Sequence, residues 1–226
     1  MDLGSKNRLT THSAKLFGSN SLFDEIARAV CKVGVLPRKE LYESWQVVQR
    51  VSRWVGAEWR AAARAEQPRR VVELCAGHGL AALMLLLRHP NLHALSVELT
   101  PPASADKLRA AILARWPELT LRLSVIRGDL ARTPLAAGDL ALAIHACGSL
   151  TDLVIDRAVA AQASVALLPC CHAIAPVAFL GGWLAGPLAL DTLRAVRLHG
   201  AGYSVTTRTI DARITPQNRL LLARPR

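Results

Sequence analysis

A glycine-rich loop at residues 73–79 is the first feature of the sequence that could bind a ligand. It reads Glu73-Leu-Cys-Ala-Gly77-His-Gly79, follows an apolar run and precedes a helical pattern. Glycines let the backbone approach a ligand closely, and the first turn of a helix offers unpaired N–H groups. Ala82 replaces the third glycine of a dinucleotide fingerprint. The acidic Glu73 suits a cationic amino-acid moiety, and a tight turn without a ligand is the alternative.

Acidic residues follow two later strand-like runs. Glu98 closes the run 92–99, and Asp129 follows the run 119–126. The carboxyl ends of parallel strands meet at one edge of a sheet, where such sheets bind ligands. A carboxylate at Glu98 can accept both hydroxyls of a ribose, and Asp129 is placed to reach an adenine amino group. We therefore expect these acids to surround a nucleoside.

Histidine and cysteine are concentrated after the next two strand-like runs. The motifs His-Ala-Cys-Gly and Pro-Cys-Cys-His contain His145, Cys147, Cys170, Cys171 and His172. A metal site is one interpretation, because zinc selects these ligands, although adjacent cysteines rarely share an ion. A nucleophilic cysteine with a lowered pKa is a second. The third, small thiols packed around a ligand with no metal bound, is the one we expect.

The elements that must position these residues alternate between apolar runs and helical periodicity. Strands are expected at 70–75, 92–99, 119–126, 139–145 and 164–168, and helices at 80–87, 103–116 and 149–160. This alternation predicts an α/β fold with a parallel sheet covered on both faces. Two further runs, 203–210 and 219–223, have no helix between them and are expected to form an antiparallel hairpin at one edge. Ser149 and Asp152 form a capping-box pattern.

The first 66 residues differ from the rest in composition and in hydrophobic pattern. Residues 1–20 are rich in glycine, serine and asparagine and resemble a loose arm. A helix is expected to begin after Ser21, and a second to span 38–65. We expect 1–66 to form a basic arm with helices that serves as a lid or a substrate-binding extension. Residues 67–226 are expected to form the ligand-binding domain.

The loop, the acids and the final hairpin together resemble a class I S-adenosylmethionine-dependent methyltransferase, over about residues 70–226. The resemblance implies a Rossmann-like sheet of seven mostly parallel strands with an antiparallel C-terminal hairpin, plus N-terminal helices. It implies S-adenosylmethionine as the cofactor. The residues expected to bind that cofactor are Glu73, Ala76, Gly77, Gly79, Glu98, Asp129 and His145.

Further motifs narrow the resemblance to a subgroup. The H-x-C-G motif, the P-C-C-H motif and Thr215-Pro-Gln-Asn218 resemble a subgroup that includes tRNA 2′-O-methyltransferases and methyltransferase-domain proteins. The stretches Leu36-Pro-Arg-Lys39 and Glu43-Ser-Trp45 resemble its bacterial members. The chain departs from the tRNA enzymes because it has no Cys/His zinc-finger segment before these stretches.

Methyl transfer from a sulfonium mainly requires that donor and acceptor be aligned. A hydroxyl or amine acceptor must also lose a proton. His145 is the expected general base, since it follows a strand and an unperturbed imidazole has a pKa of about 6.5. Asp152 is the second candidate, and helix capping is its alternative role.

The charge balance bears on the methyl acceptor. The 226 residues carry 28 Lys+Arg and 17 Asp+Glu, for a net charge of +11 and a pI of about 10.3. This balance favours a polyanionic partner, and an arginine-rich composition is an equal explanation. With the subgroup resemblance, it predicts an RNA substrate, tRNA or rRNA. The residues expected to contact substrate are Arg38, Lys39, Tyr42, Trp45, Cys170, Cys171 and His172.

Other functions stay open at this point. The acceptor could be a small molecule or a protein, with the N-terminal helices closing the pocket, and Trp45 could simply pack its helix onto the sheet. A non-catalytic S-adenosylmethionine-binding module is a further alternative. Residues 1–20 contain no apolar leader, and the uncharged stretch 173–190 is interpreted as a core segment or loop. We therefore expect a cytoplasmic RNA-modification enzyme with no membrane partner.

Overall fold

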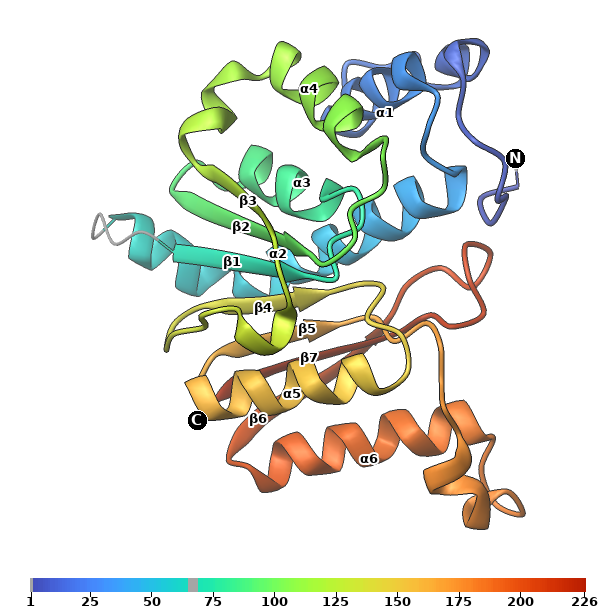
Figure 1. Cartoon of the computed structure of the whole chain (residues 1–226), viewed down its shortest axis with the longest axis vertical. Coiled ribbons are helices and arrows are strands. Elements are labelled where there is room, and N and C mark those ends of the chain that lie inside the picture. Colours follow the sequence, from blue (N-terminus) through green and yellow to red (C-terminus); the bar gives the residue numbers. More distant parts are fainter. Residues whose placement is uncertain (1, 65–68) are drawn as a thin grey trace.

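The computed structural model describes residues 2–64 and 69–226. A seven-stranded sheet in the order β3-β2-β1-β4-β5-β7-β6 forms its centre (Figure 1). The strands are β1 (Arg69–Leu74), β2 (Leu92–Glu98), β3 (Leu123–Arg127), β4 (Leu140–Ala143), β5 (Ser164–Leu167), β6 (Tyr203–Thr209) and β7 (Arg219–Pro225). The expected α/β fold is confirmed.

The first five strands are parallel, and the last two form a hairpin. β1 lies between β2 and β4, with Val71 paired to Ala94 on one side and to Leu140 on the other. β7 runs antiparallel to both β5 and β6, so the expected hairpin occupies one edge of the sheet. The strand order reverses between β1 and β4. Sheets of this kind bind ligands beyond the carboxyl ends of the strands at such a switch point.

Successive residues of each strand face opposite layers of the core. Val71 and Leu140 belong to one buried cluster, whereas their neighbours Val72 and Ala141 belong to the other. Both faces of the sheet are therefore covered. This explains why the central strands read as continuous apolar runs rather than as an alternation of apolar and polar residues.

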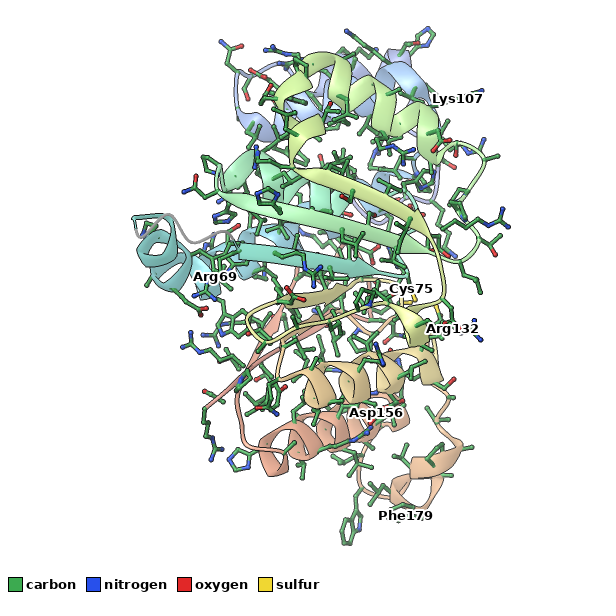
Figure 2. All side chains as sticks on the ribbon, turned by 60° about the vertical axis from the view of Figure 1, so that its left-hand side comes forward. Arg69, Cys75, Lys107, Arg132, Asp156 and Phe179 are labelled. Atoms are coloured by element: carbon green, nitrogen blue, oxygen red, sulfur yellow. The ribbon has the colours of Figure 1, made fainter. Side chains whose placement is uncertain are left out.

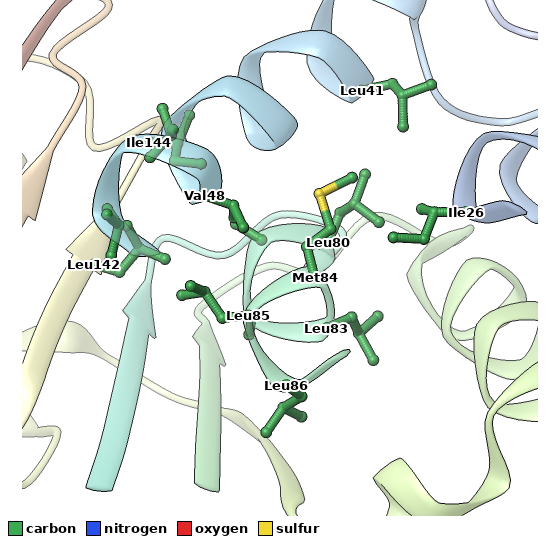
Figure 3. Close-up of a cluster of buried hydrophobic side chains, with 14 of the residues drawn as sticks. Ile26, Leu41, Val48, Leu80, Leu83, Met84, Leu85, Leu86, Leu142 and Ile144 are labelled. Carbon is green, nitrogen blue, oxygen red and sulfur yellow. The ribbon is translucent and has the colours of Figure 1, made fainter. Parts of the chain in front are cut away.

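The helices form the two covering layers. One side of the sheet carries α1 (Leu22–Val33), α2 (Arg38–Arg64), α3 (Leu80–Arg88) and α4 (Ala105–Arg115), and the other carries α5 (Ser149–Ala161) and α6 (Gly186–Gly200). Figure 3 shows Leu85 of α3 in one buried cluster with Val48 of α2 and Leu142 of β4. Because its residues from Leu80 to Leu86 are all buried, α3 is fixed firmly behind the glycine-rich loop.

The N-terminal segment is not a loose arm. It contains a 3-10 helix, Thr11–Leu16, and a bridge between Arg8 and Pro37. Leu9 is fully buried and Phe17 is 2% exposed, both in the core beside α1. The expectation from composition is therefore wrong, because two apolar side chains are enough to anchor a polar segment.

The uncharged stretch 173–190 contains a 3-10 helix, Ala175–Leu180, and the first turn of α6. No helix was expected there, so α6 is an element that the sequence analysis missed. Its signal was present: a proline begins its first turn, and Leu190, Arg194 and Leu198 are buried at helical spacing. Across the described ranges, no helix is both long and apolar enough to cross a membrane.

Two local expectations are corrected. Strand β3 begins at Leu123 rather than at 119, because Pro117–Leu121 forms a 3-10 helix. The capping box at α5 does not form, since Gly148 is the N-cap residue and makes no side-chain cap. The helix expected after Ser21 is present as α1, and Ser21 caps it: its hydroxyl accepts the Asp24 N–H at 3.2 Å.

The expected domain boundary at residue 66 lies outside the described residues. On its N-terminal side, α1 and α2 share one buried cluster with α3 and with sheet residues. The division into 1–66 and 67–226 stays a prediction about function, and in packing the two parts form a continuous core.

Candidate active site

The glycine-rich loop joins the end of β1 to the start of α3. Gly77 has φ +54° and Gly79 has φ +71°, in the left-handed region that favours glycine. A Cβ at Gly79 would lie 2.8 Å from the Ser96 Oγ, whereas a Cβ at Gly77 would meet no atom within 4 Å. Gly79 is therefore required by packing, and Gly77 borders open space.

Glu98, the last residue of β2, reaches this loop. Its Oε2 accepts the Gly77 N–H at 2.9 Å, and its Oε1 accepts the Thr100 N–H at 3.1 Å. Gly77 and Glu98 border a cavity of about 220 Å³, whose charged lining includes Arg109 and Arg127. The structure thus brings the glycines and Glu98 together at one cavity, as the sequence predicts.

Glu73 lies buried beneath the loop. Its Oε2 accepts the Ala82 N–H at the start of α3, at 3.1 Å, and Ser96 donates a further hydrogen bond. Burial raises the pKa of Glu73 to about 7, although these hydrogen bonds oppose the rise. With Ala76 and His145, Glu73 lines a second cavity of about 40 Å³. The carboxyl group is thus placed between the helix N-terminus and this small cavity.

Asp129 follows β3 and caps a 3-10 turn, Leu130–Arg132. Its Oδ1 accepts the Ala131 N–H at 2.9 Å, and the residue is exposed. Asp129 is not among the residues that line the two cavities. Its contact with an adenine amino group therefore stays a prediction.

His145 follows β4 and lies against a buried carboxylate of α2. The His145 Nε2 is 3.8 Å from the Glu43 Oε2, and the Lys39 Nζ is 2.7 Å from the Glu43 Oε1. Burial raises the pKa of Glu43, while Lys39 and a hydrogen bond from Thr215 oppose the rise. The buried Glu43 Oε2 has no hydrogen-bond partner among the described residues. This leaves one carboxylate oxygen directed toward the imidazole.

The electrostatic setting of His145 follows from this arrangement. Burial, together with the charge of Lys39, lowers the pKa of His145 to about 4. The imidazole is therefore neutral at neutral pH, which is the form that a general base requires.

Glu43 and Thr215 are the site residues that the sequence analysis missed as functional. Both lie in motifs that carry the subgroup resemblance. The signal for Glu43 was its spacing of four residues from Lys39, which places the pair on one face of α2. No comparable signal exists for Thr215, because its approach to Glu43 depends on how the β6–β7 connection packs against α2.

Asp152 forms an ion pair with Arg194 of α6. Its Oδ1 accepts from the Arg194 Nε at 3.0 Å, and its Oδ2 accepts from Nη2 at 2.8 Å. The Arg194 side chain is 2% exposed, so losing its partner would leave a buried charge unpaired. The structure therefore favours a structural role for Asp152 over both helix capping and general-base catalysis.

The three cysteines of the predicted patch lie close together, whereas His172 contacts a different group. The Sγ atoms of Cys147 and Cys170 are 3.3 Å apart, and those of Cys170 and Cys171 are 3.7 Å apart. The His172 Nε2 lies instead 2.8 Å from the Asp191 Oδ1 of α6. The expected patch is thus real for the thiols, and His172 belongs to a neighbouring ionic network.

The expected substrate-binding aromatics are half-buried and pack against the core. The rings of Tyr42 and Trp45 lie 5.2 and 5.1 Å from the ring of Phe23. The Arg88 guanidinium lies 5.5 Å from the Trp45 ring centroid. This arrangement favours the packing role over the stacking of a base. The Arg38 Nη1 donates to the Asp2 carbonyl at 3.2 Å.

Comparison with known proteins identifies a family. A family profile described as "Methyltransferase domain" matches residues 38–175, which is more than half of the chain. No curated protein matches the sequence closely enough to count as a relative.

Solved structures with TM-scores above 0.5 share the fold at low sequence identity. Magnesium protoporphyrin IX methyltransferase from Synechocystis PCC 6803, with bound S-adenosylmethionine, has a TM-score of 0.54 and 14% identity, covering 96% of both chains. A putative caffeoyl-CoA O-methyltransferase from Staphylococcus aureus has a TM-score of 0.52 and 12% identity, covering 91% of this chain and 93% of the other. An O-methyltransferase family protein from Burkholderia thailandensis scores 0.48 at 16% identity, covering 96% of this chain and 63% of its own.

Proposed function

Since the chain belongs to the methyltransferase-domain family, we propose that this S-adenosylmethionine-dependent methyltransferase acts on RNA, either tRNA or rRNA. The cofactor assignment is supported by one contact above all, the Glu98 carboxylate on the Gly77 N–H at the rim of the 220 Å³ cavity. The RNA assignment is supported by the net charge of +11.

The residues around the loop fit S-adenosylmethionine. Gly77 leaves open space where a side chain would intrude, and Glu98 offers carboxylate oxygens to a ribose. Glu73 lies behind the loop, where ionisation of its carboxyl would balance a cationic amino group. The cofactor supplies a methyl group that is already activated on a sulfonium. The task of the chain is therefore to hold the acceptor in line with that methyl group.

His145 is the proposed general base. Its imidazole is neutral because burial lowers its pKa to about 4, so it can accept the acceptor's proton at Nδ1 or Nε2. The resulting imidazolium would face the Glu43 carboxylate, whose nearer oxygen is 3.8 Å from Nε2. Glu43 is thus a positioning residue that favours the protonated state during the reaction.

Exposed cations of the N-terminal segment support contacts with phosphates. Lys6, Arg8, Lys15 and Lys32 are exposed, whereas Lys39 is paired with Glu43. Each phosphate contact adds to the salt dependence of binding. The proposed RNA surface is therefore carried mainly by the exposed group, with Arg38 beside it.

A methyl-transfer assay with labelled S-adenosylmethionine tests the proposal. The chain is incubated with three separate pools from cells: RNA, protein and small molecules. We expect label in the RNA pool alone, sensitive to ribonuclease. Label confined to another pool would overturn the RNA assignment, and label in no pool would leave only the cofactor-binding module.

Binding of bulk tRNA at several salt concentrations tests the basic surface. Replacing Lys15 and Lys32 with alanine should flatten the slope of log K against log salt by about one to two units. The matched control replaces two exposed arginines elsewhere, Arg208 on β6 and Arg226, and should leave the slope unchanged. Equal slopes in both double variants would contradict an N-terminal RNA surface.

A small-molecule acceptor is the second candidate, and one observation favours it. Leu36, Glu40 and Ser44 line the 40 Å³ cavity together with the glycine-rich loop, so the start of α2 closes over the site. On this alternative, Glu40→Ala should raise KM for the acceptor without changing RNA affinity. If the acceptor is RNA, the binding free energy is distributed over many contacts along a long substrate. Glu40→Ala should then have little effect on KM.

A further inference from the structure

We propose that Cys147, Cys170 and Cys171 bind a zinc ion, with three thiolate ligands and a fourth position open to an exchangeable ligand. The site lies at the carboxyl edge of the sheet, after β4 and β5. It goes beyond the proposed methyl transfer and does not depend on the acceptor being RNA. The sequence alone favours packed thiols without a metal. The positions of the three Sγ atoms favour a metal ion instead.

The separations of the sulfur atoms fit a single ion. A tetrahedral zinc with Zn–S bonds of about 2.3 Å holds its sulfur ligands about 3.8 Å apart. The Cys147–Cys170 and Cys170–Cys171 separations are 3.3 and 3.7 Å, and all three Sγ atoms lie within 4.8 Å of one another. The adjacent cysteines therefore present their thiols to one point. Adjacent cysteines rarely share an ion because their side chains usually point in different directions, and Cys170 and Cys171 do not diverge in this way.

The sheet holds these thiols in place without help from a metal. β4 and β5 are adjacent and parallel, and the Leu168 N–H donates to the Ala143 carbonyl at 3.0 Å. Beyond the strands, the Gly148 N–H donates to the Cys171 carbonyl at 2.9 Å. Gly148 has φ +59°, a conformation that favours glycine directly after Cys147. The ligands are thus preorganised by backbone hydrogen bonds.

Zinc binding at this site depends on pH. The three Sγ atoms lie within 4.8 Å of one another, so one divalent ion can contact all of them once they are deprotonated. Binding replaces three thiol protons by one zinc ion, so affinity must increase with pH.

Within the described part of the chain, no fourth side chain joins the three thiols as a ligand. His172 would be the natural fourth ligand, but its Nε2 lies on Asp191. Cys147 and Cys171 are both exposed, so water or a substrate atom can reach the ion. Three protein ligands with one open position are typical of catalytic rather than structural zinc.

The site is a neighbour of the cofactor loop. β1 and β4 are adjacent and parallel, so Cys75 after β1 lies at the same edge of the sheet as Cys147 after β4 (Figure 2 labels Cys75). Three thiolates with one Zn²⁺ carry a net charge of −1. That sign complements a sulfonium held at the same edge of the sheet.

Metal analysis of the untagged full chain, grown with added zinc, tests the proposal. We expect about one zinc per chain by elemental analysis. Cys147→Ser and Cys171→Ser should lose most of it, while Cys31→Ala, a buried cysteine of α1, should keep it. Cobalt substitution should give thiolate-to-cobalt charge-transfer absorption that is abolished by Cys147→Ser. Circular dichroism of each variant identifies any that fail to fold.

Three results would overturn the zinc site. One is wild-type protein with free thiols, zinc below about a tenth of an equivalent and no cobalt absorption. Another is a mass lower by two hydrogens that is restored by reductant, which would show a disulfide. The third is zinc retained by a folded Cys147→Ser variant. The cobalt titration of wild-type protein decides the matter even if both serine variants fail to fold.

Discussion

Glu73 and Glu98 flank the same loop, and their surroundings give them different properties. Glu98 is half-buried and accepts two backbone N–H groups, from Gly77 and Thr100. Glu73 is enclosed, and burial raises its pKa to about 7. Acids in different surroundings can take different roles at one site. We expect Glu98 to bind the ribose through its carboxylate oxygens, and Glu73 to respond to pH and to a cationic ligand.

Replacing Glu98 tests its role at the ribose. Glu98→Ala should weaken binding of S-adenosylhomocysteine by about 1.5–3 kcal/mol, the scale for losing a charged hydrogen-bond partner. Isothermal titration calorimetry measures the change. Glu118→Ala, which replaces an exposed acid within the 3-10 helix before β3, is the control for altered charge. Unchanged affinity in Glu98→Ala would remove this residue from the ribose role.

The raised pKa of Glu73 predicts a pH-dependent stability. Between about pH 4.5 and 7 the folded chain keeps a proton that the unfolded chain releases. The Glu73 contribution to the free energy of unfolding therefore falls as pH rises through this window, by up to about 3 kcal/mol. Glu73→Gln carries no titrating group, so its stability relative to wild type should improve from pH 5 to pH 8.

Urea unfolding of both proteins at the two pH values measures this difference without added cofactor. A comparison between variants is needed because His89 acts in the opposite direction. Burial lowers the pKa of His89 to about 4, so its contribution grows as pH rises from about 4 to 6.5. That contribution is common to both proteins and cancels. A stability difference that stays constant with pH would contradict a protonated Glu73.

The neutral imidazole of His145 illustrates what a sequence can and cannot reveal about a site. Its place after β4 follows from the apolar run before it, and the Gly77–Glu98 contact follows from parallel strands ending at one edge. The environment of His145 cannot be predicted in the same way, because Glu43 comes from helix α2, which packs over the sheet edge. Burial of a charged residue depends on tertiary packing, which local spacing does not encode.

At the scale of elements, the N-terminal segment is anchored by single side chains. Phe17 is buried against Phe23, with ring centroids 5.8 Å apart, whereas its neighbour Leu16 is 46% exposed. Phe17→Ala should therefore lower the free energy of unfolding by about 3–5 kcal/mol. Leu16→Ala should cost less than about 1 kcal/mol, as is usual for surface changes. Denaturant unfolding compares the two, and equal effects would mean that the segment is not anchored through Phe17.

The predicted elements are most accurate where apolar runs are bounded by glycine or proline. β1, α3 and the hairpin were placed within about two residues for this reason. The sequence pattern does not reveal α6, because the uncharged sequence before it hides where the helix begins. The capping box at α5 does not form for another reason: Asp152 gains more from the buried Arg194 than from the helix end. At α5, therefore, a tertiary contact overrides a local pattern.

At the scale of the whole molecule, the charge balance predicts a dependence on salt. A net charge of +11 opposes compaction through self-repulsion, which added salt screens. The melting temperature should therefore rise by a few degrees between about 0.02 and 0.3 M sodium chloride. Differential scanning calorimetry checks this. A fall over the same range would mean that surface ion pairs, such as Arg115–Glu25, outweigh the repulsion.

The position of β7 determines when the sheet can be completed during synthesis. β7 leaves the ribosome after the other six strands of the sheet, yet it lies between β5 and β6. Until it emerges, β5 has an unpaired edge, and β6 has no neighbour in the sheet. A nascent chain therefore has an unpaired strand edge, which can pair with other chains, for the time needed to translate the segment from β5 to β7. A chaperone that shields β5 in this interval would raise the yield of folded protein.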